Sequence, residues 1–400
     1  MPLELGAEFV QGRARSLLGR LKKAGLRVVP TAQRHLWLHG GRLEDSTGLF
    51  SQALEQVATL HGDRPVDEAL AERLRAGEMT ATVLPLARSY VEGYYAADAS
   101  RASAEAIGEL ERASRVLHGD QAVRVEGGYS GVLEQPLRSI LADEPDALRL
   151  STVVTDLRWS EGRVLVGSRK PTGLQLPRVR ARAAVVTVPL GVLRAPAGAT
   201  GAIRFTPRVP AMERAAARLQ PGPLFKLLLR FRTPFWTEGT STAHQTRLRG
   251  FGFAHLPEGP VRTWWSTAPL DSGVLTGWAG GPAAQALSES SVDERRTRAL
   301  QSLSQLFGVE PRALEAMLEA ELCHDWQADP FARGGYAYTP VGGVGAMQAF
   351  TVPVANTLFF AGEHTHDGGQ AGTVHGALET GERAARACLL ALRGRKAASF

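Results

Sequence analysis

Leu358-Phe-Phe-Ala-Gly-Glu-His-Thr365 opens the stretch that decides the fold, and it continues as His366-Asp-Gly-Gly-Gln-Ala-Gly372 and Thr373-Val-His-Gly-Ala-Leu-Glu-Thr-Gly-Glu-Arg-Ala-Ala385. Residues 358–361 form an apolar run with the length of one buried strand. From Thr373 onward, small and apolar residues recur at helical spacing, and Thr373 itself suits a helix N-cap. The stretch therefore predicts a strand, a glycine-rich loop and a helix.

This predicted unit offers a place for a ligand. Glycines in the loop let the backbone pass close to a bulky group. The first N–H groups of the helix have no partner within it and carry partial positive charge. Such a turn suits an anionic or electron-accepting ligand. An ordinary strand–helix unit that uses glycine for close packing is the alternative, and the residues alone leave both open.

Length and composition narrow the class of protein. A chain of 400 residues favours two domains, and 44% hydrophobic with 22% charged residues is ordinary for a globular protein. No apolar run approaches the ~18 residues of a membrane helix, and no secretory signal is visible. Two cysteines, a net charge of +6 and ten scattered histidines predict no disulfide framework, metal site or nucleic-acid partner. We expect a cytoplasmic protein of unknown oligomeric state.

Hydrophobic periodicity and turn signals predict the elements between the termini. Residues 13–117 are predicted to be helical, with separate helices over 13–24, 50–60, 66–76, 81–97 and 102–117. Further helices are predicted over 132–141, 292–307 and 311–320. Strands are predicted over 148–155, 163–166, 181–189, 225–231, 250–253, 262–266 and 274–280, the last four in one sheet.

Four other segments carry motifs. They are Leu3-Glu-Leu-Gly-Ala-Glu-Phe-Val-Gln-Gly12, Val125-Glu-Gly-Gly-Tyr-Ser130, Lys226 placed nine and ten residues before Phe235-Trp236, and Trp326-Gln-Ala-Asp-Pro-Phe-Ala-Arg-Gly-Gly-Tyr336. Together with the C-terminal stretch they resemble the flavin-containing amine oxidases, the family of monoamine oxidases, polyamine oxidases and lysine-specific histone demethylases. The resemblance implies FAD as the cofactor.

Residue roles follow from the resemblance. It places the following residues at the cofactor: Gly6, Ala7, Phe9, Val154, Trp326, Gly362, Glu363, Gly372, Thr373 and Val374. Among these, Glu363 is expected beside the phosphates and ribityl chain, and Val154 at the adenine. Lys226 is implied as the catalytic residue that holds a water against flavin N5. Glu8, Tyr336 and Thr373 are implied to face the substrate.

Three of these assignments have plain alternatives. Lys226 interrupts an apolar strand, so its ammonium either extends to solvent or serves a site. Glu8 either attracts a cationic substrate or is an exposed loop acid. Trp326 is either part of the flavin site or only a core anchor for its loop.

The fold class implied is α/β and α+β. An FAD/NAD(P)-binding Rossmann-like domain, over 1–12, 120–200 and 341–400, is interleaved with a mixed-sheet substrate domain and helical arm over 13–119 and 201–340.

The G-x-G-x-x-G fingerprint is absent from the sequence. We therefore expect the recorded chain to lack an N-terminal βαβ unit, on the order of forty to fifty residues. The absence of this unit would result from a start site placed too late or from a fragmentary sequence. The alternative is a genuinely shortened protein.

A chain without that unit has an expected weakness. The strand at 358–361 is expected to lack a partner, and the chain to fold poorly for that reason.

The function implied is an FAD-dependent amine oxidase that converts an amine to an imine and reduces O2 to hydrogen peroxide. The partners would be a small-molecule amine and O2, without a metal. Thr373 stands where several amine oxidases carry a second aromatic residue, which favours a polyamine, a larger amine or a peptidyl lysine. The alternatives are a protoporphyrinogen-oxidase-like or desaturase-like enzyme, and a non-catalytic binding protein.

Overall fold

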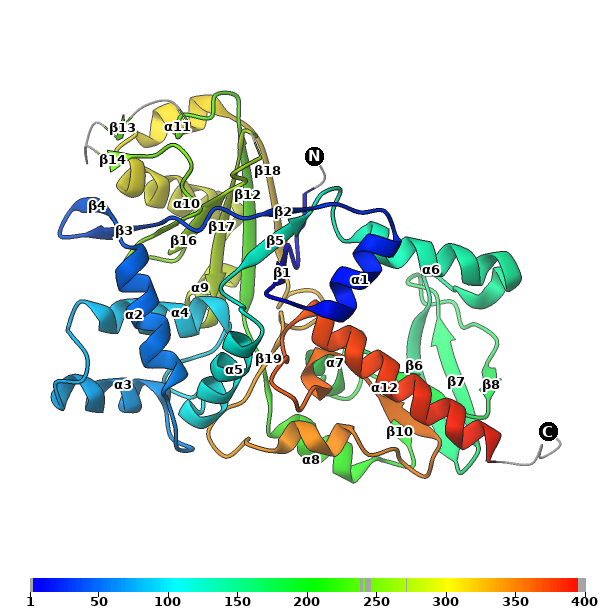
Figure 1. The fold of residues 1–400 in the computed structure, drawn as a ribbon. Helices are drawn as coiled ribbons and strands as arrows, with labels where there is room; N and C mark the ends of the chain where they lie inside the picture. The colour runs from blue at the N-terminus through cyan, green and yellow to red at the C-terminus, as the bar shows by residue number, and fades with distance from the viewer. Residues whose placement is uncertain (1–2, 238–239, 242–245, 271, 395–400) are drawn as a thin grey trace.

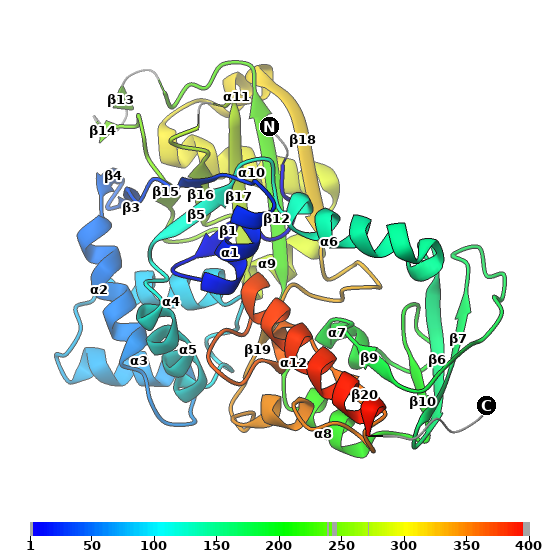
Figure 2. The ribbon, with the colours of Figure 1, turned by 45° about the vertical axis from the view of Figure 1, so that its right-hand side comes forward.

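The computed structural model describes residues 3–237, 240–241, 246–270 and 272–394, arranged as two lobes with a small sheet between them (Figure 1). One lobe holds the largest sheet and a group of helices. The other holds the long C-terminal helix α12 (Val374–Arg393) and a smaller twisted sheet. The N-terminal segment lies where the lobes meet (Figure 2).

The largest sheet has seven strands in the order β18-β12-β17-β16-β15-β3-β4. The bounds are β3 (His35–His39), β4 (Arg42–Asp45), β12 (Leu224–Phe231), β15 (Phe253–His255), β16 (Thr263–Ser266), β17 (Val274–Gly280) and β18 (Leu318–Asp325). The prediction that the strands from residue 225 to 280 share one sheet is confirmed. Successive side chains of a strand point to opposite faces. Accordingly Phe225, Leu227 and Leu229 enter the core while Lys226 points to the other face.

Helices cover the core face of this sheet. They are α9 (Gly281–Ser288), α10 (Val292–Phe307) and α11 (Pro311–Met317). The bounds predicted for α10 are confirmed, because Ser291 and Glu294 form a capping box that fixes its start. The helix predicted over 311–320 ends earlier, because the chain turns into β18 at Leu318.

The helix predicted over 13–24 is confirmed as α1 (Arg15–Lys23), but the prediction that residues 13–117 are helical is wrong for residues 28–45. Residues 28–45 form three strands, β2 (Val28–Pro30), β3 and β4. The sequence did carry a hairpin signal, since the apolar residues 36–38 lead to Gly40-Gly41. Both glycines have positive φ, 56° and 75°, as a two-residue hairpin turn requires. The hairpin then pairs with the large sheet through β15 and becomes its edge.

The helical arm that follows is confirmed, with boundaries shifted by a few residues. It consists of α2 (Thr47–Ala58), α3 (Val66–Arg75), α4 (Val83–Tyr94) and α5 (Ala104–Val116). These helices share a core with Trp37 of β3, so the arm is attached to the large sheet. None of the helices in the described part of the chain has the length and apolar character that a membrane crossing needs.

The second lobe contains the strand that opens the deciding stretch. Strand β20 (Leu358–Phe360) pairs in parallel with β9 (Ala184–Val186). The expectation that this strand lacks a partner is therefore wrong, because the predicted strand at 181–189 supplies one. Phe359 and Ala361 pack against Ala384 of α12, as the strand–loop–helix prediction requires.

Beside this pair stands a four-stranded sheet in the order β10-β6-β7-β8. The other elements of this lobe are β6 (Val153–Ser160), β7 (Arg163–Arg169), β8 (Val179–Ala181), β10 (Arg204–Thr206), α6 (Ser130–Asp143), α7 (Leu190–Leu193) and α8 (Pro210–Ala217). Because β10 pairs with β6 and α8 joins the same core, we propose that the domain boundary lies after Leu219 rather than at residue 200.

A small sheet of β1 (Phe9–Gln11), β5 (Ala122–Val125) and β2, with helix α1 (Arg15–Lys23), joins the lobes. Its core includes Val10 and Leu17, and Val374 of α12 packs against it. This contact brings the N-terminal segment to the start of the C-terminal helix. The remaining short elements are η1 (Pro145–Ala147), β11 (Gln220–Pro221), β13 (Thr240–Ser241), β14 (Thr246–Arg247), β19 (Ala337–Tyr338), η2 (Ala346–Phe350) and η3 (Glu363–Thr365).

Candidate flavin site

The start of α12 is built as the sequence predicts. Thr373 is the N-cap, and its Oγ1 accepts the N–H of Gly376 at 3.0 Å. The N–H groups of Val374 and His375 precede the first possible intrahelical bond, so they have no partner within the helix. The helix thus presents free donors and the positive end of its dipole to the loop before it.

Glu363 lies beside this helix end. Its carboxylate accepts the N–H of Gly372 at 2.9 Å and the N–H of Ala337 at 3.1 Å. Burial raises the pKa of Glu363 to about 7, and the two backbone hydrogen bonds offset only part of that rise. Near neutral pH this carboxyl holds a proton part of the time, and it can then donate as well as accept.

The loop glycines are required by its geometry. Gly362 has φ +134° and Gly372 has φ +76°. A Cβ added at Gly372 would lie 3.3 Å from the ring of Tyr336. Tyr336 is fixed in turn by its hydroxyl, which donates to the backbone carbonyl of Tyr94 in the helical arm. The predicted residues Gly372, Thr373 and Tyr336 therefore lie together, with an aromatic ring against a side-chain-free backbone.

A second group forms around Lys226. Its side chain is fully buried, so the alternative in which it extends to solvent is excluded. The Nζ atom donates to the carbonyl of Gly6 at 3.2 Å and to Oε2 of Glu8 at 2.8 Å. Burial lowers the pKa of Lys226 from its ordinary value, and Glu8 opposes part of that effect.

Trp326 reaches the same segment. Its Nε1 donates to the carbonyl of Leu5 at 3.0 Å, and a Cβ on Gly6 would lie 3.3 Å from its ring. The structure thus brings Gly6, Lys226 and Trp326 together, as the resemblance implies. Trp326 contacts the N-terminal segment directly, so it does more than anchor its own loop.

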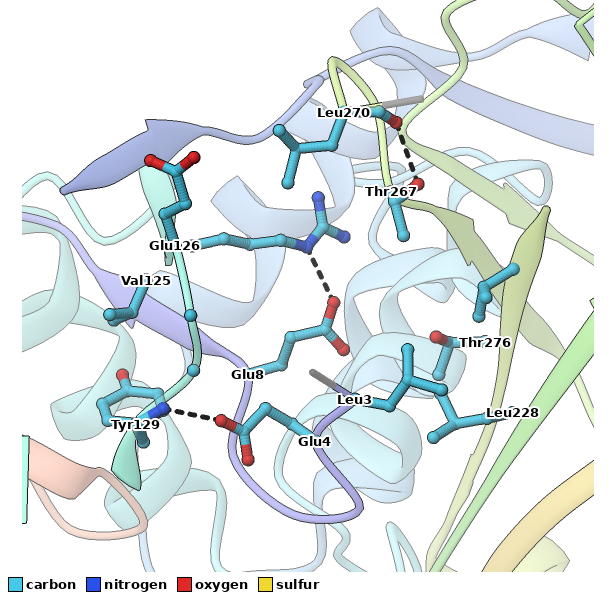
Figure 3. A pocket seen from close by; sticks show the side chains of 14 residues that line it. Leu3, Glu4, Glu8, Val125, Glu126, Tyr129, Leu228, Thr267, Leu270 and Thr276 are labelled. Atoms are coloured by element: carbon cyan, nitrogen blue, oxygen red, sulfur yellow. Dashed lines mark hydrogen bonds and ion pairs between the residues drawn. The ribbon is translucent and has the colours of Figure 1, made fainter. Parts of the chain in front are cut away.

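Glu8 is not an exposed loop acid, since only 13% of its side chain is exposed. Its Oε1 accepts from Nε of Arg124 at 2.7 Å, and its Oε2 accepts from Nε1 of Trp265 at 3.1 Å. Burial by itself would raise the pKa of Glu8, but Lys226 and Arg124 outweigh it and hold that pKa below its ordinary value. Figure 3 shows Glu8 extended toward the arginine that it pairs with.

Sequence reasoning missed Arg124 and Trp265. Arg124 lies in β5 among many other arginines of the chain, and its two Nη atoms donate to the carbonyls of Ser266 at 2.8 Å and Ala268 at 3.2 Å. Trp265 lies in β16 beside Phe9, with ring centroids 5.6 Å apart. No local sequence pattern marks either residue, because only the folded chain brings β5 and β16 to the N-terminal segment.

Two other predicted residues do not contribute side-chain contacts to these groups. Val154 is in β6 and packs against the core around Leu157 and Phe205, so its implied place at the adenine stays a prediction. Ala7 has its side chain exposed. Across the ranges 3–237, 240–241, 246–270 and 272–394, no group of three or more His, Cys, Asp or Glu side chains is placed to hold a metal ion.

These residues fit a flavin. A planar ring needs flat, side-chain-free walls, and Gly6 beside Trp326 and Gly372 beside Tyr336 provide them. Reduced flavin carries negative charge, which the free N–H groups of α12 and the ammonium of Lys226 would stabilise. Glu363 would lie toward the cofactor's polar chain. The fold and the site together define a flavin-binding oxidoreductase.

Comparison with known proteins gives the family. The family described as flavin containing amine oxidoreductase matches residues 52–389, and the chain belongs to it. This membership assigns FAD as the cofactor and confirms the fold class and the resemblance read from the motifs.

Individual relatives differ in function and length. The chain is 32% identical over 271 residues to lysine-specific histone demethylase 1 homolog 3 of Arabidopsis thaliana, a match covering 65% of this chain and 15% of that protein. Matched regions span 15% to 29% of three demethylase relatives. The chain is also 26% identical to polyamine oxidase 2 of Arabidopsis thaliana, over 97% of this chain and 78% of that one.

Solved structures show the same fold. A wild-type putrescine oxidase bound to putrescine superposes with a TM-score of 0.75 and 19% identity, over 97% of this chain and 88% of that chain. At this identity the likeness shows the fold alone.

Proposed function

We propose that this chain oxidises a C–N bond of an amine to an imine, with O2 reduced to hydrogen peroxide. FAD, when bound, supplies the two-electron chemistry. The observation that carries the proposal is the buried Lys226, whose Nζ is fixed by Gly6 and Glu8 next to Trp326. An ammonium held in this place can donate a hydrogen bond to a water molecule. It can also stabilise the negative charge of reduced flavin.

The surroundings of Lys226 favour an uncharged amine as the reacting form. Phe9, Phe253, Trp265 and Trp278 form a continuous aromatic surface next to it, with ring centroids 5.5 to 6.1 Å apart. Such a surface removes water from an approaching amine and favours its neutral form. The neutral form has the free nitrogen lone pair that C–H oxidation requires.

The substrate proposed is an aliphatic amine with more than one amino group or a long chain. Thr373 at the cap leaves the ring of Tyr336 without a second aromatic wall, so a small aromatic amine has no closed cage. Polyamine oxidases among the relatives support this substrate class.

The test is anaerobic mixing of the flavin-loaded protein with putrescine, spermidine, an aromatic amine and a lysyl peptide, followed at the flavin absorbance band. We expect the aliphatic polyamines to bleach the flavin, and peroxide to appear when air is admitted. A flavin-loaded protein that no amine reduces would reject the proposal, and reduction by a porphyrinogen instead would favour the alternative branch of the superfamily. A Glu363→Ala variant should hold less FAD, measured as the ratio of flavin to protein absorbance.

A further inference from the structure

Lys226 is held by an unusually small set of partners for a buried cation. An ammonium has three N–H donors. Two of them donate to Gly6 and Glu8, and within the described residues no acceptor takes the third. The other donors around it, Arg124 and Trp265, turn to Glu8 rather than to Lys226. Among the described residues, Glu8 is therefore the carboxylate in hydrogen-bond contact with Lys226, while Glu4 adds a weaker attraction and the ring centroid of Trp265 lies 5.5 Å from Nζ.

That carboxylate is shared. Lys226 and Arg124 lie on the two oxygens of Glu8, at 2.8 Å and 2.7 Å, so two buried cations have one anion between them. The next acid, Glu4, lies in the same region but accepts the N–H of Tyr129. On the neighbouring strand β18, His324 stands opposite Lys226 and is engaged with Asp329.

Removing the charge of Glu8 would leave Lys226 and Arg124 facing each other. A buried ammonium without a counter-ion gives up its proton rather than stay charged. Arginine does not deprotonate in proteins, so Lys226 is the group that would become neutral.

We propose that Glu8 is a positioning residue that keeps Lys226 charged and fixed at the carbonyl of Gly6, and that Arg124 competes with Lys226 for the same carboxylate. This rests on the proposed function, in which Lys226 serves the flavin reaction. Arg124 is anchored to the carbonyls of Ser266 and Ala268, so the ion pair ties β5 and the β16–β17 turn to the lysine.

A cavity gives this group contact with solvent (Figure 3). It is lined by Glu4, Glu8, Arg124, Glu126 and Tyr129 on one side and by Leu228, Thr267 and Thr276 on the other. The space open to the centres of water molecules is about 50 Å³, which exceeds the roughly 10 to 15 Å³ that a cavity needs to hold a water. Lys226 does not line this cavity, but Glu8 does, and Oε2 of Glu8 lies 2.8 Å from Nζ of Lys226. Protons can therefore reach the lysine through Glu8, and the lysine can titrate in the folded chain.

The test is carbon-13 NMR of lysine side chains labelled at Cε. The chain has five lysines, at positions 22, 23, 170, 226 and 396, so the spectrum is simple and Lys226→Met assigns its signal. In Glu8→Gln we expect the titration midpoint of Lys226 to fall by at least ~2 pH units. In Arg124→Gln we expect it to rise, because the competing cation is gone.

Glu126→Gln is the matched control. Glu126 lines the same cavity but pairs with Arg27 at the surface, so the midpoint of Lys226 should not move. A midpoint in Glu8→Gln within ~0.5 units of the wild type would overturn the proposal, as would a fall in Arg124→Gln. If Glu8→Gln does not fold, Arg124→Gln still tests the proposal. A rise in the Lys226 midpoint supports it, and a fall overturns it.

This measurement separates the two proposals, because it needs no amine turnover. A fall of the midpoint in a protein that oxidises no amine would support the role of Glu8 and reject the proposed function. Amine oxidation by a protein whose Lys226 midpoint does not move in Glu8→Gln would support the proposed function and reject the role of Glu8. In the flavin-loaded enzyme, Glu8→Gln should also move the pH profile of flavin reduction, which a merely structural role would leave in place.

Discussion

Replacing Glu363 by Gln should make the stability of the flavin-free chain less sensitive to pH. The pKa of Glu363 rises from 4.5 to about 7 in the folded chain because the carboxyl is buried. The folded state therefore binds this proton more tightly than the unfolded state, and stability falls as pH rises from about 4.5 to about 7. Gln keeps the size of the side chain and has no proton to lose.

The size of the effect follows from the two pKa values. A gap of about 2.5 pH units corresponds to about 3.4 kcal/mol, of which about 2.5 kcal/mol falls between pH 5 and pH 8. Because 21% of the side chain is exposed, solvent reduces the cost of its charge, and we expect about 1.5 to 2.5 kcal/mol. The variant should gain this much stability relative to the wild type as pH rises from 5 to 8.

Urea unfolding followed by tryptophan fluorescence at pH 5, 6, 7 and 8 measures this difference. Losing one backbone hydrogen bond at Ala337 or Gly372 lowers the variant's stability equally at each pH, so the slope against pH isolates the titration. Glu109→Gln, which removes an exposed carboxyl on α5, is the control and should keep the pH dependence of the wild type. A difference between wild type and Glu363→Gln that changes by less than about 0.5 kcal/mol over this range would refute the reasoning.

Three further predictions use other parts of the structure. Lys226→Met should leave FAD bound but slow flavin reduction or reoxidation by about 10- to 100-fold, which is the scale of one charge-assisted hydrogen bond. Stopped-flow absorbance measures these rates, and unchanged rates would contradict a catalytic role. Leu227→Ala in the fully buried centre of β12 should lower the free energy of unfolding by about 2 to 5 kcal/mol in urea. Gly108→Ala should destabilise by about 1 to 3 kcal/mol, since its Cβ would lie 2.1 Å from the carbonyl oxygen of Leu60. Gly19→Ala, with open space around it in helix α1, should instead stabilise by about 0.5 to 1 kcal/mol; equal melting shifts in the two glycine variants would contradict this contrast.

The sequence determined those elements whose signals are local. Residues 358–361 and Thr373 predicted the strand and the capped helix because apolar length and cap chemistry act within a few residues. The start of α10 was also predicted, and the structure shows it to be a local feature, since Ser291 and Glu294 of its capping box lie one turn apart. The hairpin turn at Gly40-Gly41 is also a local feature, but it was missed because the whole range 13–117 was taken as helical.

The tertiary structure alone decided which side chains share the site and which charge each carries. Glu8 meets Arg124, Lys226 and Trp265 from positions 116, 218 and 257 residues away, and no pattern of spacing encodes such contacts. Sequence left Lys226 and Glu8 each with two interpretations, because the outcome depends on burial and on the nearest opposite charge. Both quantities exist only after β1, β5, β12 and β16 have packed together, since desolvation and Coulomb attraction act through space rather than along the chain.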